Sequence, residues 1–305
     1  MCTMGQCVTP SCQPAVAGAG PNCGSTGMDN CCDSPYVLGG MFSRSFDGIT
    51  YTDSSAVATV SDFRMDRYEI TVGRFRAFLN AYPGSRPAAG AGQHPTLGAP
   101  SGWQTAWDGN LPSTIGMYQA LLKCGGFQTW TDTPGANEKK PMNCLNWYDA
   151  FAFCAWDGGR LATEAEWNYV AAFGNGACPY PWSSCVPINT TYAVYDCTGD
   201  GSIGVSQGGT CTANDILAVG SRSPTGDARW SQSDISGNLN EWTLDTYASY
   251  VTPCNNCANL TNGTNKVYRG GNFISGPPDL LSGARFNILA THRDPGIGAR
   301  CVRAP

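Results

Sequence analysis

Residues 159–167 read Gly-Arg-Leu-Ala-Thr-Glu-Ala-Glu-Trp, and this stretch carries the clearest local structural signal in the chain. Thr163 and Glu166 have the spacing of a capping box, in which each side chain accepts a hydrogen bond from the backbone N–H of the other residue. Acidic residues in the first turn also suit the helix dipole. The stretch therefore predicts a helix that begins after Thr163 and buries Trp167 and Val170.

Two further helices are predicted upstream. Thr71 caps one whose apolar residues recur at spacings of three and four: Val72, Phe75, Phe78, Leu79 and Tyr82. Asn146 caps the other, and Gly158-Gly159 ends it. Alternation and aromatic content predict strands over 37–42 and 63–70. Beyond Phe173 no helical period persists, so short strands and long loops are expected there.

Composition excludes several classes of protein. The chain has 305 residues, of which only 13% are charged, against roughly 25% in typical soluble domains. A formal net charge of −5 without a basic run argues against nucleic acid as a partner. No apolar run approaches the roughly 18 residues of a transmembrane helix, so no transmembrane segment is expected.

The chain contains sixteen cysteines, which bear on its cellular compartment. Reducing thiol pools in the cytosol keep cysteines unpaired, so disulfides on this scale indicate a secreted or cell-surface protein. Zinc is the alternative, but the chain has only His94 and His292 and lacks paired C-x-x-C motifs. The single C-x-x-C, Cys254 to Cys257, lies among turn-forming residues, which favours a disulfide-closed loop over a redox site.

The sequence divides at about residue 36. Residues 1–36 hold six cysteines among Gly, Pro, Ser and Ala, and are predicted to form an extension outside the core of a domain at 37–305. The first residues do not have the pattern of a secretory leader. Cys2 lies where a mature lipoprotein carries its lipid anchor, and the alternative is that Cys2 is an ordinary disulfide partner.

Seven segments, in order along the chain, resemble one family, that of the formylglycine-generating enzyme, also called the sulfatase-modifying-factor domain. They are residues 68–72, 141–150, 159–167, 180–182, 236–242, 269–273 and 298–301. The resemblance covers about residues 37–305. It implies an α+β, C-type-lectin-like fold with few short helices and strands, stapled by disulfides and often holding calcium.

The resemblance also implies a disulfide between Cys154 and Cys301, which would close a long loop and stabilise the domain by about 4–5 kcal/mol in the chain-entropy model. The remaining pairs expected in this domain join neighbours along the chain: Cys254–Cys257, Cys178–Cys185, Cys197–Cys211 and Cys124–Cys144.

Formylglycine generation, as the resemblance implies it, requires two cysteines after the Gly-Gly motif that bind copper(I), a soft ion that prefers thiolates. Here Ser275 and Leu280 occupy those positions, and residues 274–296 contain no cysteine. Copper binding and formylglycine generation are therefore not expected. Relatives that form sulfur–histidine bonds use an iron held by three histidines, and this chain has only two histidines.

The resemblance further implies a calcium site. Asn238, the Leu239 carbonyl, Glu241 and the Thr243 carbonyl match the family's calcium-binding segment position by position. Side-chain and backbone oxygens are the ligands that a hard cation prefers. The alternative is a hydrogen-bonded turn without a metal.

Three functions are compatible with these features. The sequence favours a non-catalytic protein that binds a protein or glycan ligand with the former catalytic face: Asn240, Ser275, Asp279, Arg285 and Arg293. The alternative is a divergent oxidoreductase of the family with a non-copper active site. The third is an assembly protein that self-associates through its cysteine-rich extension.

Overall fold

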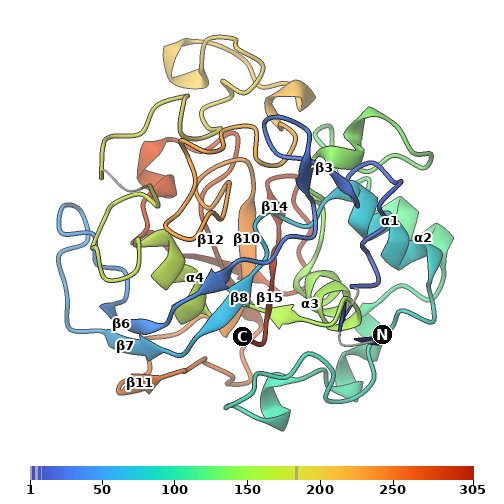
Figure 1. The fold of residues 1–305 in the computed structure, drawn as a ribbon, viewed down its shortest axis with the longest axis horizontal. Helices are drawn as coiled ribbons and strands as arrows, with labels where there is room; N and C mark the ends of the chain where they lie inside the picture. The colour runs from blue at the N-terminus through green and yellow to red at the C-terminus, as the bar shows by residue number, and fades with distance from the viewer. Residues whose placement is uncertain (1, 4–5, 8, 183–184) are drawn as a thin grey trace.

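The computed structural model describes residues 2–3, 6–7, 9–182 and 185–305, with side chains from residue 9 onward. Helices and strands are short and separated by long loops (Figure 1). The α-helices are α1 (Val72–Asn80), α2 (Ile115–Leu121), α3 (Trp147–Trp156) and α4 (Glu164–Ala171). The 3-10 helices are η1 (Ala99–Ser101), η2 (Thr105–Asn110), η3 (Ala136–Lys139), η4 (Val205–Gln207), η5 (Ala213–Asp215) and η6 (Pro277–Leu280).

The strands build a mixed α+β fold, the class expected from the sequence. They are β1 (Cys2–Thr3), β2 (Gln6–Cys7), β3 (Pro21–Cys23), β4 (Asp29–Asn30), β5 (Tyr36–Val37), β6 (Gly40–Ser43), β7 (Val57–Val60), β8 (Phe63–Met65), β9 (Arg160–Leu161), β10 (Asn240–Thr246), β11 (Cys254–Asn255), β12 (Asn265–Arg269), β13 (Phe286–Leu289), β14 (Ile297–Gly298) and β15 (Cys301–Arg303). Among the described residues, no helix is both long and apolar enough to cross a membrane.

The three predicted helices form where their caps place them. Thr71 accepts a hydrogen bond from the Arg74 backbone at the start of α1. Asn146 and Thr163 each complete a capping box, at the starts of α3 and α4 respectively. Aromatic side chains of α1 and α3 pack together, with Phe75 and Phe153 stacked at 5.8 Å between ring centroids. Sequence periodicity missed α2, whose residues are mostly exposed and lack an apolar stripe.

The two predicted strands are shorter than expected. Residues 37–42 split between β5 and β6, which belong to different sheets. The chain turns at Gly39, whose N–H donates to the Asp62 side chain rather than to a strand neighbour. The strand predicted over 63–70 ends at Met65, because the Asp66 carboxylate is held by Arg74 and Arg303.

Two four-stranded sheets position the residues of functional interest. One has the order β13-β12-β10-β14, in which β10 and β14 are parallel, and the other has the order β5-β8-β15-β9. Every residue of β10 is buried, and β10 lies near the middle of the molecule in Figure 1. The loop between β13 and β14 therefore lies beside the start of β10.

Seven disulfides join the described cysteines. Five are those expected from the sequence: Cys124–Cys144, Cys154–Cys301, Cys178–Cys185, Cys197–Cys211 and Cys254–Cys257. The other two, Cys12–Cys32 and Cys23–Cys31, lie in the N-terminal segment. The lipid anchor proposed at Cys2 concerns a side chain outside the described part of the molecule.

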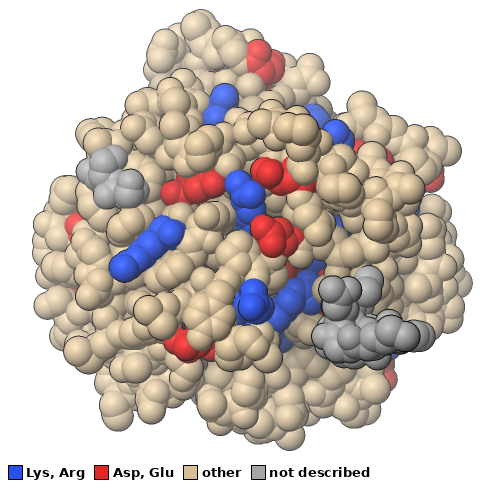
Figure 2. Space-filling view, in the orientation of Figure 1, with Lys and Arg blue, Asp and Glu red and all other residues tan. Residues whose placement is uncertain are grey.

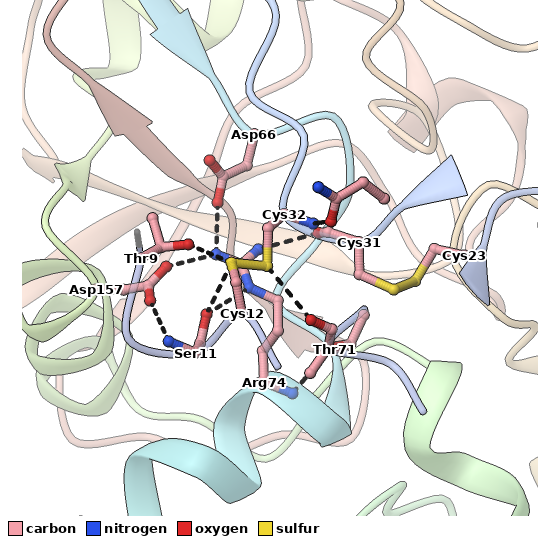
Figure 3. Close-up of a disulfide and its surroundings, with 12 residues drawn as sticks. Thr9, Ser11, Cys12, Cys23, Cys31, Cys32, Asp66, Thr71, Arg74 and Asp157 are labelled. Carbon is pink, nitrogen blue, oxygen red and sulfur yellow. Dashed lines mark hydrogen bonds and ion pairs between the residues drawn. A yellow bond between two sulfur atoms is a disulfide. The ribbon is translucent and has the colours of Figure 1, made fainter. Parts of the chain in front are cut away.

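The N-terminal segment packs on the domain instead of standing apart from it (Figure 3). Ser11 is fully buried: its N–H donates to Asp157 at 2.9 Å, and its hydroxyl accepts from Arg74 Nε at 2.9 Å. The Thr71 hydroxyl donates to the Gly18 carbonyl. Residues 11–32 therefore pack against the core, whereas the whole of 1–36 was expected to lie outside it. The reason is that the buried charged side chains of Arg74 and Asp157 take hydrogen-bond partners from this segment.

The face of the molecule seen in Figure 2 carries few charged side chains, in keeping with the charged content of 13%. Lysine and arginine side chains on this face lie close to aspartate and glutamate side chains instead of gathering in a patch of one sign. This face therefore offers no extended basic surface of the kind that nucleic acid requires.

Candidate functional site

The first of the two positions at which the resemblance implies a copper-binding cysteine holds Ser275, in a tight turn. The Asn272 side-chain oxygen accepts from the N–H groups of Ile274 and Ser275, at 2.9 and 3.1 Å. The Ser275 hydroxyl in turn lies 3.2 Å from the Asn272 N–H. Ser275 is half-buried, and its hydroxyl is engaged in stabilising the turn.

The second position holds Leu280, at the end of η6, and its side chain is fully buried. Leu280 belongs to an apolar cluster with Tyr180 and Trp182. It also lies against Gly271, where an added Cβ would come within 2.7 Å of a Leu280 methyl carbon. Leu280 is therefore a packing residue, and neither position offers a soft ligand to copper(I).

Asn240 lies close to this turn, across Gly296. The Asn240 N–H donates to the Gly296 carbonyl at 2.9 Å, and the Gly296 N–H donates to the Asp294 carboxylate at 2.7 Å. Gly296 also abuts the Asn272 amide so closely that a side chain at position 296 would collide with it. We call Asn240, Asn272, Ser275 and Asp294 the polar face.

The polar face contains one buried polar atom without a partner among the described residues and one partly exposed carboxylate. The side-chain oxygen of Asn240 is buried and has no hydrogen-bond partner among the described residues. The Asp294 carboxylate is 43% exposed and lies 3.7 Å from His292 Nε2. Leaving a buried carbonyl oxygen unpaired costs about 1–3 kcal/mol, so a donor from a bound molecule or an ordered water would be stabilising at Asn240.

Tyr268 of β12 borders this region and was not identified from the sequence. Burial, and then the negative charges of Asp294 and Asp279, raise the pKa of the Tyr268 hydroxyl. Asp279, in η6, is half-buried. Asn272 was also missed, although its place directly after Gly270-Gly271 marks a turn.

The two arginines predicted for the same face are held elsewhere. Arg285 donates to Glu164 from Nε and Nη2, at 2.8 and 2.7 Å, and its guanidinium lies over the rings of Tyr247 and Tyr250. Arg293 pairs with the buried Asp149 carboxylate at the start of α3. The structure therefore connects Asn240 to Ser275 only through Gly296 and Asn272, and it directs both arginines to carboxylates at helix N-termini.

The predicted calcium ligands have other partners. The Glu241 carboxylate is fully buried and accepts from Arg300 Nε at 2.8 Å and Nη2 at 2.6 Å. Trp167 Nε1 donates to the same carboxylate at 2.8 Å. The Thr243 carbonyl accepts from Trp147 Nε1, also at 2.8 Å.

Asn238 is engaged as well: its side-chain oxygen accepts from the Leu217 N–H at 3.2 Å, and its amide donates to Glu69 at 3.1 Å. Leu239 donates its N–H to the other Glu69 oxygen. Because Arg300 supplies the positive charge beside Glu241 and Trp147 donates to the Thr243 carbonyl, the Glu241 and Thr243 oxygens do not fit the calcium site that the resemblance implies. Among the described residues, no group of three or more Asp, Glu, His or Cys side chains is arranged to hold a metal.

Arg300 lies among more carboxylates than it can neutralise. Glu69 and Asp234 are buried near it in addition to Glu241. Burial raises the pKa of Asp234 to about 6, and burial together with the charges of Asp234 and Glu241 raises the pKa of Glu69 well above its usual range. We call Glu69, Asp234, Glu241 and Arg300 the Arg300 cluster.

Several curated proteins are similar in sequence to this chain. The chain is 27% identical over 235 residues to the formylglycine-generating enzyme of Mus musculus, covering 71% of this chain and 58% of that enzyme. It is 27% identical over 233 residues to the inactive Cα-formylglycine-generating enzyme 2 of the same species, covering 70% of this chain and 68% of that protein. It is 25% identical over 290 residues to the hercynine oxygenase of Mycolicibacterium smegmatis, covering 88% of this chain and 57% of that enzyme.

Solved structures have the same fold. PvdO from Pseudomonas aeruginosa superimposes with a TM-score of 0.60 at 22% identity, covering 90% of this chain and 95% of PvdO. Treponema denticola variable protein 1 superimposes with a TM-score of 0.55 at 17% identity, covering 89% and 95% of the two chains. Residues 26–305 match a single family model, which is nearly the whole chain. The chain belongs to the family of the sulfatase-modifying factor enzyme 1-like domain.

Proposed function

We propose that this chain is a secreted or cell-surface, non-catalytic member of its family, and that it binds a polar protein or glycan ligand at the polar face. One observation carries the proposal: the two positions where catalysis requires thiolates hold Ser275 in a turn and Leu280 in an apolar cluster. Copper(I) binds thiolates in preference to hydroxyl and aliphatic groups. The chain therefore has the fold of its family but not the thiolate pair that would bind copper(I).

The polar face supplies groups suited to a ligand that donates hydrogen bonds. Asn240 offers a buried acceptor without a partner among the described residues, and Asp294 offers a half-exposed carboxylate. Asp279 is half-buried in η6 nearby and adds a second negative charge. Such acceptors match the hydroxyl groups of a glycan or the amines of a basic peptide.

The proposed location rests on the seven disulfides, which persist in oxidising compartments. One of the two mouse relatives is named as an inactive enzyme. Its sequence is as similar to this chain as that of the mouse formylglycine-generating enzyme, at 27% identity in each case. Self-assembly through the N-terminal segment is the weaker proposal, since residues 11–32 bury part of their surface against α1 and α3.

A divergent oxidoreductase without copper is the alternative. It is favoured by the hercynine oxygenase relative, whose name describes chemistry other than formylglycine generation. In such a reaction, the neighbouring side chains of His292 and Asp294 would exchange protons with the substrate.

Binding tests the proposal directly. Wild-type protein and the Asp294→Asn variant are screened on a glycan array and a panel of basic and acidic peptides. The amide introduced by this substitution retains an oxygen that can accept from the Gly296 N–H, so the loop should persist while the charge is lost. Asp132→Asn, at an exposed carboxylate paired with Lys123, is the matched control. The proposal predicts a ligand whose affinity falls about tenfold in Asp294→Asn and is unchanged in the control. A ligand bound equally by all three proteins would place binding elsewhere.

A further inference from the structure

Lys266 is a buried lysine that no part of the site above uses. It lies on β12, between β10 and β13, and only 9% of the residue is exposed. Its Nζ donates to the Thr246 hydroxyl at 3.0 Å and lies 4.2 Å from the centroid of the Trp147 ring. Lysine is almost never buried without a charged partner, so this position calls for an explanation.

Lys266 has no carboxylate within ion-pair distance among the described residues. Asp245, the acidic residue that acts on it, is committed to backbone groups: its oxygens accept from the N–H groups of Glu164 and Asn259, at 2.7 and 2.8 Å. The titratable groups near Lys266 are Asp245 on β10 and Tyr148 on α3. Burial lowers the pKa of Lys266 to about 8, opposed by the charge of Asp245.

Lys266 lines a small cavity of about 90 Å³. Its inner walls are aromatic and aliphatic: Trp107, Trp147, Tyr148, Leu244 and Leu260. Its rim is formed by Thr261, Asn262 and Gly263, all of which are exposed, so small solutes have a path from solvent. A desolvated amine in an apolar pocket is the arrangement in which lysine becomes a nucleophile.

We propose that Lys266 is a reactive amine that condenses with small aldehydes entering this cavity. The neutral amine attacks the carbonyl carbon to give a carbinolamine, and loss of water forms the C=N bond of an imine. The nitrogen loses both hydrogens of the neutral amine, which leave with the carbonyl oxygen as one water molecule. No electrons are exchanged, and hydrolysis reverses the reaction.

The size of the cavity restricts the aldehyde. The cavity of about 90 Å³ lies between the side chains of Trp147, Tyr148 and Leu260, so a two- or three-carbon aldehyde should react there faster than an aromatic aldehyde. The Thr246 hydroxyl, 3.0 Å from the amine, is placed to exchange protons during dehydration. This site is separate from the polar face and does not depend on the function proposed there.

Reductive trapping tests the proposal. The whole chain is treated at neutral pH with acetaldehyde and sodium cyanoborohydride, which converts an imine to a stable ethylamine, and each lysine is quantified by peptide mapping. The chain contains only four lysines, Lys123, Lys139, Lys140 and Lys266, so every site can be followed. Lys266 should be ethylated at least about tenfold faster than the exposed Lys123, because more of its amine is neutral.

Two comparisons separate the proposal from general amine reactivity. Lys266→Arg should lose only the fast-reacting site, while Lys123→Arg should keep it, with both variants checked for native circular dichroism. Replacing acetaldehyde with pyridoxal should abolish the preference for Lys266, since pyridoxal exceeds the cavity. Ethylation of Lys266 no faster than that of Lys123, or equal reaction of Lys266 with both aldehydes, would overturn the proposal.

Discussion

The Arg300 cluster and the polar face each include one residue of β10, but they differ in how fully their polar groups are hydrogen-bonded and shielded from water. In the Arg300 cluster, Glu241 takes hydrogen bonds from Arg300 and Trp167 and is shielded from water. On the polar face, Asn240 keeps a buried oxygen that has no partner among the described residues, and Asp294 remains half-exposed. Two neighbouring residues of one strand thus differ: the Glu241 carboxylate is satisfied by protein donors, and the Asn240 side-chain oxygen has none among the described residues.

This difference shows why a motif match is not enough to assign a ligand set. Glu241 is in the position of a calcium ligand by resemblance, but an arginine supplies its counter-charge. Whether a carboxylate binds a metal is decided by its neighbours in space, and those come from distant segments such as residues 300 and 167.

The largest effect is expected from breaking the Arg300 cluster. Arg300→Met leaves Glu241 buried without a counter-charge and should cost about 3–5 kcal/mol of unfolding free energy, measured by urea denaturation. The control is Asp132→Asn, which breaks the exposed pair with Lys123 and should cost less than about 1 kcal/mol. Equal losses in the two variants would remove the distinction between buried and exposed charges.

Removal of residues 1–32 should have the next largest effect. Arg74 would lose Ser11 as an acceptor, Asp157 would lose a donor, and Thr71 would lose the Gly18 carbonyl. Unsatisfied buried groups cost about 1–3 kcal/mol each, so the midpoint of thermal unfolding should fall by several degrees. A truncated protein that melts with the wild type would restore the view of this segment as a separate extension.

A smaller, pH-dependent effect is expected from Asp234. Its folded-state pKa of about 6 lies above the unfolded value of about 3.9, so the folded protein holds more protons between these pH values. Stability contributed by this group is therefore lost as pH rises through about 6.

Asp234→Asn should accordingly stabilise the protein by about 2 kcal/mol at pH 8, relative to its effect at pH 4. Urea denaturation at both pH values measures the difference, and Asp132→Asn, at an exposed carboxylate, serves as the control. A gain that is the same at both pH values would contradict the raised pKa.

The smallest effect should come from calcium removal. Because Arg300 and Trp147 occupy two of the four predicted calcium ligands, a chelator should leave the thermal midpoint unchanged within about one degree. Titration with calcium after chelation provides the complementary measurement. A midpoint that falls with chelator and returns with calcium would show that a calcium site exists.

The sequence predicted those features that depend on local patterns. The caps at Thr71, Asn146 and Thr163 fix the helix starts, and five of the disulfides follow from the resemblance and from neighbouring positions. The ligand-binding role of Asn240 and Ser275 stays a prediction, and the structure connects these two residues through Gly296 and Asn272.

The rest depends on contacts between distant residues. Arg285 and Arg293 look like ligand-binding cations in the sequence, and only the folded chain brings them to Glu164 and Asp149. The burial of Lys266 could not be predicted, because no residue next to it in the sequence marks this lysine as buried. The N-terminal segment was expected to make no core of its own because its apolar residues are scattered, but it docks through polar groups that satisfy Arg74.

Copper(I) titration tests the central claim, that this family member has lost its metal chemistry. Wild-type protein is titrated anaerobically with copper(I) against a chromogenic competitor, then supplied with oxygen and a cysteine-containing peptide, with Ser275→Cys/Leu280→Cys as the comparison. Wild type should bind no copper at these positions and leave the peptide unchanged, while the double variant gains a thiolate pair. Tight stoichiometric binding by the wild type, or conversion of the peptide cysteine to an aldehyde, would contradict the account.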